Sequence, residues 1–229
     1  MNGRRVVAVV PAHDEGDRIG DTVQALRGLP GVSEVVVVDD GSRDDTSLAA
    51  LAAGATVLRI RRRLGKGAAV EGALARISPA DVWLLADADL AGSAAALAPV
   101  LEEVLEGRAD LAVAKFPPQS GGGVGAVKRF AAGAIRVLSG FRATQPLSGQ
   151  RALTAAALHA CRPLAQGFGM ETAMTIDAAR AELRIREVAA PGLAHRVTHR
   201  DLRGFVHRGR QGVDILRAVA ARALRRRAS

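Results

Sequence analysis

Two carboxylates one residue apart, Asp87 and Asp89, are the side chains in this sequence best suited to chemistry. They follow residues 83–86, an apolar run without polar alternation, which is typical of a strand covered on both faces. Open α/β sheets bind their ligands at the carboxyl ends of the strands. Carboxylate oxygens at such a position can hold a hard divalent cation, which in turn neutralises phosphate groups. The alternative is that Asp87 caps a turn and Asp89 is solvated.

Two other polar loops have features that suit the binding of a nucleotide. Asp39 and Asp40 end the apolar run 35–38, and Lys66 lies between two glycines at the start of a predicted helix. Glycines at a helix start allow the backbone to approach an anion. The Walker pattern is excluded, because it needs a longer glycine-rich loop with Ser or Thr after the lysine. The alternatives are a solvated lysine and two aspartates that only cap a turn.

The elements that must position these residues alternate between strand and helix. We predict strands at 6–10 (ended by Pro11), 34–40, 56–60, 83–86 and 110–115, and helices at 17–29, 44–53, 67–77 and 93–106 (capped by Ser93). This alternation favours an α/β fold with a mostly parallel central sheet flanked by helices. In the second half we predict a helix at 124–138, and then a polar turn at 144–151 followed by a helix. Another helix is predicted to end near 181, and a half-buried strand is predicted at 183–188.

Composition narrows the class of protein. The 229 residues fit one domain, and the 48% hydrophobic content is that of a globular protein. Tyrosine is absent and aromatic residues make up only 3%, so we expect no nucleic-acid partner that stacks on aromatic rings. The single cysteine, Cys161, excludes an internal disulfide and a cysteine-built zinc site. With no signal-peptide cleavage region and no apolar run of about 18 residues, we expect a cytoplasmic protein. Its net charge of +9 indicates anionic partners.

Four of the loops resemble motifs of the family-2 glycosyltransferases, which have the GT-A, Rossmann-like fold. Residues 11–15 resemble the Pro-x-x-Asn-Glu loop of that family, with His13 and Asp14 where Tyr and Asn are usual. Residues 38–46, 65–67 and 87–89 resemble its Val-Asp-Asp-Gly-Ser-x-Asp-x-Thr, Gly-Lys-Gly and Asp-x-Asp motifs. The order and spacing of the motifs are more specific than any one of them, and the resemblance covers about residues 5–200.

Three motifs of the second half narrow the resemblance. Residues 145–151, 167–171 and 194–196 are similar to segments of retaining glucosyl-3-phosphoglycerate synthases. The Ser148-Gly149 turn also resembles inverting polyprenyl-phosphate mannose synthases. The resemblance implies a metal-dependent transfer of a hexose from a UDP- or GDP-sugar to a phosphorylated or lipid-phosphate acceptor, with retention. An inverting polyprenyl-phosphate sugar synthase is the alternative.

The same resemblance implies roles for individual residues. Asp89, His195 and Asp87 would hold Mg²⁺ or Mn²⁺, and Glu171 and Asp89 would act in catalysis. The residues expected to bind the nucleotide sugar are Pro11, Ala12, Glu15, Asp39, Asp40, Lys66, Asp87 and Ala88. The residues expected to bind the acceptor are Gly122, Gly123, Lys128, Arg129, Ser148 and Gly149. Alternatively, His195 is a solvated loop histidine, Glu171 is a helix-start glutamate favoured by the dipole, and the glycine-rich loop binds nothing.

The C-terminal segment forms a separate part of the predicted organisation. We divide the chain into a GT-A domain at 1–204, with a donor half at about 1–92 and an acceptor half at about 93–204, and a basic amphipathic helix at 205–229. In residues 213–224 the apolar side chains fall on one side of a helical wheel, with Arg217 and Arg222 outside it. Such a helix can pack on the protein's own core, lie at the inner face of an anionic membrane, or bind a second copy of the chain.

Two rival functions remain open from the sequence. A sugar nucleotidyltransferase would share the α/β form, but its glycine-rich first loop is replaced here by residues 11–16. A module that only binds polyanions or a membrane surface is supported by charge alone, and steep salt dependence without nucleotide selectivity would favour it.

Overall fold

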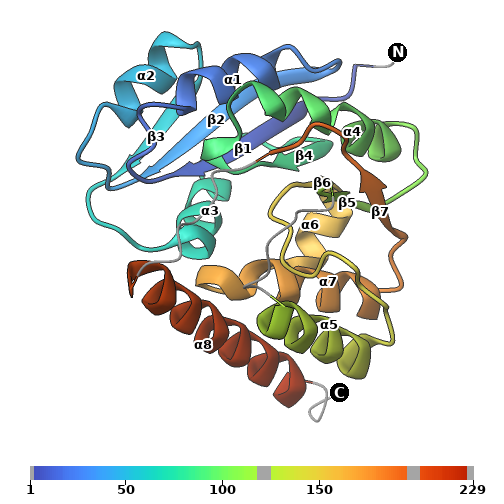
Figure 1. The fold of residues 1–229 in the computed structure, drawn as a ribbon. Helices are drawn as coiled ribbons and strands as arrows, with labels where there is room; N and C mark the ends of the chain where they lie inside the picture. The colour runs from blue at the N-terminus through green and yellow to red at the C-terminus, as the bar shows by residue number, and fades with distance from the viewer. Residues whose placement is uncertain (1–2, 118–124, 195–201, 226–229) are drawn as a thin grey trace.

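The structure is a computed structural model and describes residues 3–117, 125–194 and 202–225 (Figure 1). The strands are β1 Val6–Ala12, β2 Val32–Asp40, β3 Thr56–Ile60, β4 Val82–Leu85, β5 Leu111–Lys115, β6 Arg151–Thr154 and β7 Ile185–Ala189. The α-helices are α1 Ile19–Arg27, α2 Thr46–Ala52, α3 Lys66–Leu74, α4 Ala98–Leu105, α5 Gly125–Ser139, α6 Ala155–Cys161, α7 Met170–Arg180 and α8 Leu202–Arg225. Two 3₁₀ segments, η1 Ala88–Leu97 and η2 Gly167–Gly169, complete the described elements.

The seven strands form one sheet in the order β3-β2-β1-β4-β6-β5-β7. The pairs within the first four strands, and the pair of β5 with β7, are parallel, whereas β6 runs antiparallel to both of its neighbours. The predicted α/β fold with a mostly parallel sheet flanked by helices is therefore confirmed.

Strand β1 shows why the sheet is covered on both faces. Because successive side chains of a strand point to opposite faces, Val6 and Val10 pack on one side with α1, η1 and α4. Val7 and Val9 pack on the other side, in a cluster that includes residues of α3, α6 and α7. All four valines are fully buried, and burial of such a side chain contributes about 1.5–3 kcal/mol. This double burial explains the unbroken apolar runs of the sequence.

Two predicted boundaries are wrong, each for a local reason. Strand β1 continues through Pro11 to Ala12, because β4 pairs with β1 only as far as Val9 and Leu85, so the missing proline N–H interrupts no ladder there. Ser93 does not cap a helix: it lies inside η1, where its hydroxyl donates to the carbonyl of Leu90 at 2.6 Å. The α-helix that follows begins only at residue 98.

Strand β6 begins at Arg151, the last residue of the polar turn predicted at 144–151, and takes the place of the start of the helix predicted to follow that turn. It has four residues and begins with the charged Arg151, so neither its length nor its hydrophobic pattern identifies a strand. Its ladder with β4 places Arg151 opposite Leu85, directly before the Asp87-Ala88-Asp89 segment. The segment 145–150 is thereby brought next to the carboxyl end of β4.

Helix α8 packs on η2, α7 and α5 (Figure 1). Ile215 and Ala218 are buried on its inner side, so the alternative of packing against the protein's own core holds for this side. The helical wheel places Arg222 outside the packed side of the helix, and this prediction is wrong. Arg222 is only 4% exposed and forms an ion pair with Asp177 of α7 at 2.8 Å. None of the described helices combines the length and the hydropathy that a membrane span requires. The division of the chain into a domain at 1–204 and a helix at 205–229 stays a prediction.

Candidate functional site

The predicted donor residues gather at one edge of the sheet. Strands β1, β2 and β4 are parallel neighbours, so their carboxyl ends lie together. The chain leaves these strands into loop 13–18, loop 41–45 and η1, respectively. Pro11 and Ala12 form the end of β1 itself, where they pair with Val38 and Asp39. This edge is the place where open α/β sheets bind ligands.

Lys66 joins three segments that are far apart in the sequence. Its ammonium donates to Asp87 Oδ1 at 2.6 Å and to Glu171 Oε1 at 2.7 Å. Asp87 follows β4, Lys66 begins α3, and Glu171, which is buried, lies in the first turn of α7. Burial alone would lower the pKa of Lys66, but the two carboxylates outweigh burial and raise it. Lys66 is therefore a fixed positive charge between two acidic groups.

Gln150, a residue absent from the predicted site, holds the second oxygen of Asp87. Its amide Nε2 donates to Asp87 Oδ2 at 2.5 Å, and its Oε1 accepts from the Ser148 hydroxyl at 3.3 Å. Gln150 is fully buried, so both ends of its amide find partners inside the protein. Its place directly after the predicted Ser148-Gly149 turn is the signal that could have found it.

Gly149 allows this cluster to be compact. A Cβ atom at position 149 would lie 2.5 Å from Lys66 Nζ and 2.9 Å from Asp87 Oδ1, which is closer than side-chain atoms approach. A side chain at position 149 would therefore displace the ammonium of Lys66 and the carboxylate of Asp87, whereas glycine leaves both in place. The structure thus brings the predicted acceptor residues Ser148 and Gly149 together with the predicted donor residues Lys66 and Asp87.

Arg151 anchors the same turn and was also missed by sequence reasoning. It is fully buried, and its guanidinium donates to the carbonyl of Ser148 at 2.7 Å and to the hydroxyl of Thr175 at 2.9 Å. Burial lowers the pKa of Arg151, while the negative charge of Glu171 acts in the opposite direction. The guanidinium links the turn to α7, the helix that carries Glu171.

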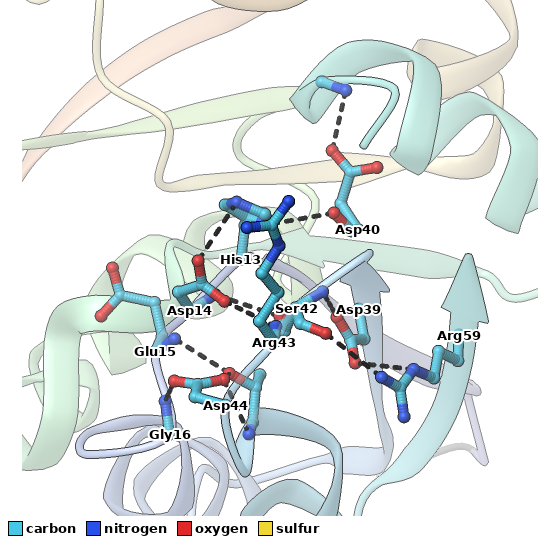
Figure 2. Close-up of polar contacts among 12 residues, drawn as sticks. His13, Asp14, Glu15, Gly16, Asp39, Asp40, Ser42, Arg43, Asp44 and Arg59 are labelled. Carbon is cyan, nitrogen blue, oxygen red and sulfur yellow. Dashed lines mark hydrogen bonds and ion pairs between the residues drawn. The ribbon is translucent and has the colours of Figure 1, made fainter. Parts of the chain in front are cut away.

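Asp39 is enclosed by protein donors (Figure 2). Its Oδ1 accepts the N–H of Ser42 at 2.8 Å, its Oδ2 accepts the Ser47 hydroxyl, and Arg59 Nε lies 3.6 Å from Oδ2. Burial would raise the pKa of Asp39, but these hydrogen bonds and the arginine lower it. A nucleotide base would have to share these oxygens, so the base contact of Asp39 stays a prediction.

Asp40 fixes the loop that leads to Lys66. Its two carboxylate oxygens accept the backbone N–H groups of Leu64 and Gly65, each at 2.7 Å, and one of these bonds is visible in Figure 2. Gly41, with φ of +74°, lies so close to this loop that a Cβ atom there would be 2.9 Å from the nitrogen of Arg63. Asp40 therefore positions Lys66 through the backbone.

The loop after β1 is bonded to the loop after β2. Three successive N–H groups, those of Asp14, Glu15 and Gly16, donate to Ser42 Oγ, Thr46 Oγ1 and Asp44 Oδ2 at 2.9–3.0 Å (Figure 2). The backbone of the predicted Pro-x-x-Asn-Glu-like loop is thereby fixed. His13 and Asp14, which stand where the family usually has Tyr and Asn, still have hydrogen-bond partners. The N–H of Asp14 donates to Ser42 as described above, and His13 Nδ1 lies 2.9 Å from the carbonyl oxygen of Asp40.

The residues predicted to bind metal are described only in part. Asp87 and Asp89 are half-buried at the end of β4, and the donor chemistry of two carboxylates fits Mg²⁺ or Mn²⁺. Among the described residues, no group of three or more His, Cys, Asp or Glu side chains is arranged to hold a metal. His195 lies outside the described residues. The third ligand therefore stays a prediction.

The predicted acceptor residues of the glycine-rich loop are less connected to this cluster. Gly122 and Gly123 lie outside the described residues. Lys128 donates to Gln145 Oε1 at 3.4 Å and so contacts the 144–149 turn, whereas Arg129 is exposed on α5. Ala88 is buried, and its carbonyl accepts the Thr22 hydroxyl at 2.8 Å.

Known proteins resemble this chain in sequence. The family model described as "Glycosyl transferase family 2" matches residues 7–156. The glucosyl-3-phosphoglycerate synthase of Mycolicibacterium paratuberculosis is 33% identical over 200 residues, which cover 76% of this chain and 60% of that protein. The chain thus spans about three fifths of the length of this curated relative.

Solved structures resemble the chain over most of its length. The glucosyl-3-phosphoglycerate synthase of Mycobacterium tuberculosis in complex with Mg²⁺ and uridine diphosphate has a TM-score of 0.81 at 29% identity, covering 96% of this chain and 79% of that one. The complex of that enzyme with Mn²⁺, UDP-glucose and phosphoglyceric acid has a TM-score of 0.80 at 28% identity, covering 96% and 80%.

Proposed function

Because the chain belongs to glycosyl transferase family 2 and has the GT-A fold, we propose that it transfers a hexose from a nucleotide-diphosphate sugar to a phosphorylated acceptor with the help of Mg²⁺ or Mn²⁺. UDP-glucose and a phosphoglycerate are the first candidates, since both are bound in the solved structures that this chain resembles. The observation that carries the proposal is the Lys66, Asp87 and Glu171 cluster at the carboxyl end of β4.

The chemistry requires a bond between sugar and diphosphate to break while negative charge develops on the leaving nucleotide. A bound metal ion would supply positive charge for the diphosphate. Asp89 would hold that ion together with His195, and Asp87, whose two oxygens accept from Lys66 and Gln150, would contact the ribose or reach the ion through water. Lys66 would add a second, permanent positive charge. The hydrogen bond from Gln150 would fix the direction of the Asp87 carboxylate, so the site is organised before the donor arrives.

Glu171 is the acidic group proposed to lie closest to the reacting sugar. In a retaining reaction it would position the sugar hydroxyls, and the leaving phosphate would accept the acceptor proton on the same face. In an inverting reaction it would take the proton of a hydroxyl acceptor as a base, whereas an ionised lipid phosphate would attack without one. We propose retention, because the Gly167–Glu171 segment is similar to the retaining synthases. An α-linked product from an α-linked donor would support this assignment.

The acceptor would bind where the Ser148-Gly149 turn meets Lys128. Lys128 supplies positive charge beside Gln145, and backbone N–H groups near the start of α5 are predicted to contact a phosphate. We also propose a peripheral position at the inner face of a membrane through the C-terminal helix, with a homodimer as the alternative use of that helix.

A thermal-shift comparison of UDP, GDP, CDP and ADP, each with and without Mn²⁺, tests the donor class. Binding to the folded state at 100 times Kd adds about 2.7 kcal/mol of stability. We expect one nucleoside diphosphate, UDP first, to raise Tm only when Mn²⁺ is present. If no nucleotide raises Tm under any condition, the chain does not bind nucleotide sugars and the rival polyanion-binding module is favoured.

A further inference from the structure

Helices α5 and α8 each expose large apolar side chains. Both helices pack on α7 and on each other, so together they form an outer layer (Figure 1). Five of the eight large apolar side chains that are exposed among the described residues belong to these two helices. They are Phe130, Val137, Val213, Leu216 and Leu224. Val137 is 73% exposed and Leu224 is 66% exposed, so this layer leaves them uncovered.

The exposed apolar side chains of α8 are separate from the residues that attach this helix to the rest of the protein. The inner side of the helix is fixed by buried Ile215 and Ala218 and by the ion pair of Arg222 with Asp177. Val213, Leu216, Ala220 and Leu224 follow the i, i+3, i+7, i+11 spacing of a single helix face. That face lies opposite the inner side of α8, so its apolar side chains add no burial to the fold. An exposed apolar surface of this kind is typical of a site that binds another molecule or a membrane.

The exposed charged side chains that the structure describes on α5 and α8 are all positive. Arg136 of α5 and Arg217 of α8 are exposed, and α5 contains no acidic residue. The one acidic residue in segment 212–224, Asp214, is directed inward and accepts the N–H of Phe168 at 3.3 Å. In the sequence, Arg225, Arg226 and Arg227 follow directly. We call the five apolar side chains, with Arg136 and Arg217, the α5–α8 face.

We propose that the α5–α8 face binds an anionic lipid surface. Its apolar side chains would enter the boundary between headgroups and acyl chains, while its arginines would contact anionic headgroups. A second copy of the chain fits this face less well, because a two-fold pairing would set arginines against arginines without acidic partners. The proposal does not depend on donor binding, since the face lies on other helices than the donor edge of the sheet.

Sedimentation of the full chain with phosphatidylcholine vesicles, with and without phosphatidylglycerol, tests the proposal. We expect binding that requires phosphatidylglycerol and weakens as salt is raised. Leu216→Ser combined with Val137→Ser should abolish binding at low salt. Arg136→Gln combined with Arg217→Gln should weaken binding by about fivefold for each arginine removed. All four side chains are exposed, so these variants should fold, which their Tm values will show.

Matched controls come from α2 and from the segment that follows α3. Leu48 of α2 is 65% exposed and Arg76 is also exposed, so Leu48→Ser and Arg76→Gln make the same chemical changes outside the α5–α8 face. These controls should bind vesicles like the unaltered chain. Absence of binding to anionic vesicles, or equal loss in the controls, would overturn the proposal. Sedimentation as a dimer that Leu216→Ser converts to a monomer would assign the face to a second copy of the chain instead.

Discussion

Lys66 connects the candidate site at the scale of single residues, because its ammonium contacts the carboxylates of Asp87 and Glu171 at once. Sequence motifs predict that Lys66 and Asp87 act together, since both belong to recognisable loops. They could not reveal that Glu171, 105 residues after Lys66, lies within hydrogen-bond distance of the same ammonium. The two interior supports of the cluster, Gln150 and Arg151, were missed because a polar residue beside a turn is ordinarily solvated.

Replacing Lys66 by methionine should lower the free energy of unfolding by about 1–3 kcal/mol at neutral pH, because two carboxylates lose their shared cation. The folded state raises the pKa of Lys66, so its contribution should be complete below about pH 10.4, the ordinary lysine value. It should decline as the pH rises through the folded-state pKa. Urea unfolding of both proteins from neutral to alkaline pH measures this difference. Lys128→Met is the control, and an equal loss in the control would contradict the assignment.

Replacing Gln150 by glutamate should weaken the binding of the metal–nucleotide complex by about tenfold at pH 8, since a carboxylate cannot donate to Asp87 and repels it. At lower pH the introduced carboxyl group, once protonated, could donate again, so the defect should shrink. Calorimetric titration across that pH range measures the effect. Gln145→Glu is the matched control, because Gln145 lies in the same turn and contacts Lys128 instead of Asp87. A pH-independent defect would indicate a merely structural role.

At the scale of elements, strands β1, β2, β4 and β5 could be predicted because each is an apolar run held inside the sheet. Strand β6 could not, because its first residue is a charged arginine whose guanidinium finds its hydrogen-bond acceptors only at the carbonyl of Ser148 and the hydroxyl of Thr175. The same reason explains Arg222, whose burial depends on Asp177 of another helix. Local patterns predict burial of apolar groups, whereas burial of charged groups depends on partners that only the tertiary fold supplies.

Replacing Asp40 by alanine should loosen loop 61–65, because the N–H groups of Leu64 and Gly65 lose their shared acceptor. We expect a loss of about 1–3 kcal/mol in stability and weaker nucleotide binding through a displaced Lys66. Chemical denaturation and nucleotide titration measure the two effects. Asp45→Ala is the control, since Asp45 is exposed and its side chain makes no capping hydrogen bond. Unchanged nucleotide affinity in Asp40→Ala would contradict the positioning role.

Replacing Arg222 by alanine should destabilise the protein by about 3–5 kcal/mol, because Asp177 is left without its cation at the junction of α7 and α8. Arg217→Ala changes the same residue type on the exposed side and should cost about 0.5 kcal/mol or less. Thermal and urea unfolding compare the two variants. Equal small losses would show that α8 is only loosely attached and would support the division of the chain at residue 204.

At the scale of the whole molecule, we propose different tasks for two surfaces. The carboxyl edge of β1, β2 and β4 gathers the acidic motifs and Lys66, and we propose that it binds the nucleotide sugar. Helices α5 and α8 lie on the far side of α7 (Figure 1), and the α5–α8 face carries exposed apolar and basic side chains. The net charge of +9 is consistent with both tasks, since diphosphates and lipid headgroups are anions.

The central claim is that the acidic end of β4 binds a metal ion together with a nucleoside diphosphate. Calorimetric titration of UDP, with and without Mn²⁺, into the full chain and into Asp89→Ala tests it most directly. We predict binding to the full chain that requires Mn²⁺, and loss of that binding in Asp89→Ala with an unchanged Tm of the free protein. Equal affinity with and without Mn²⁺, or an unchanged Mn²⁺-dependent affinity in Asp89→Ala, would contradict it.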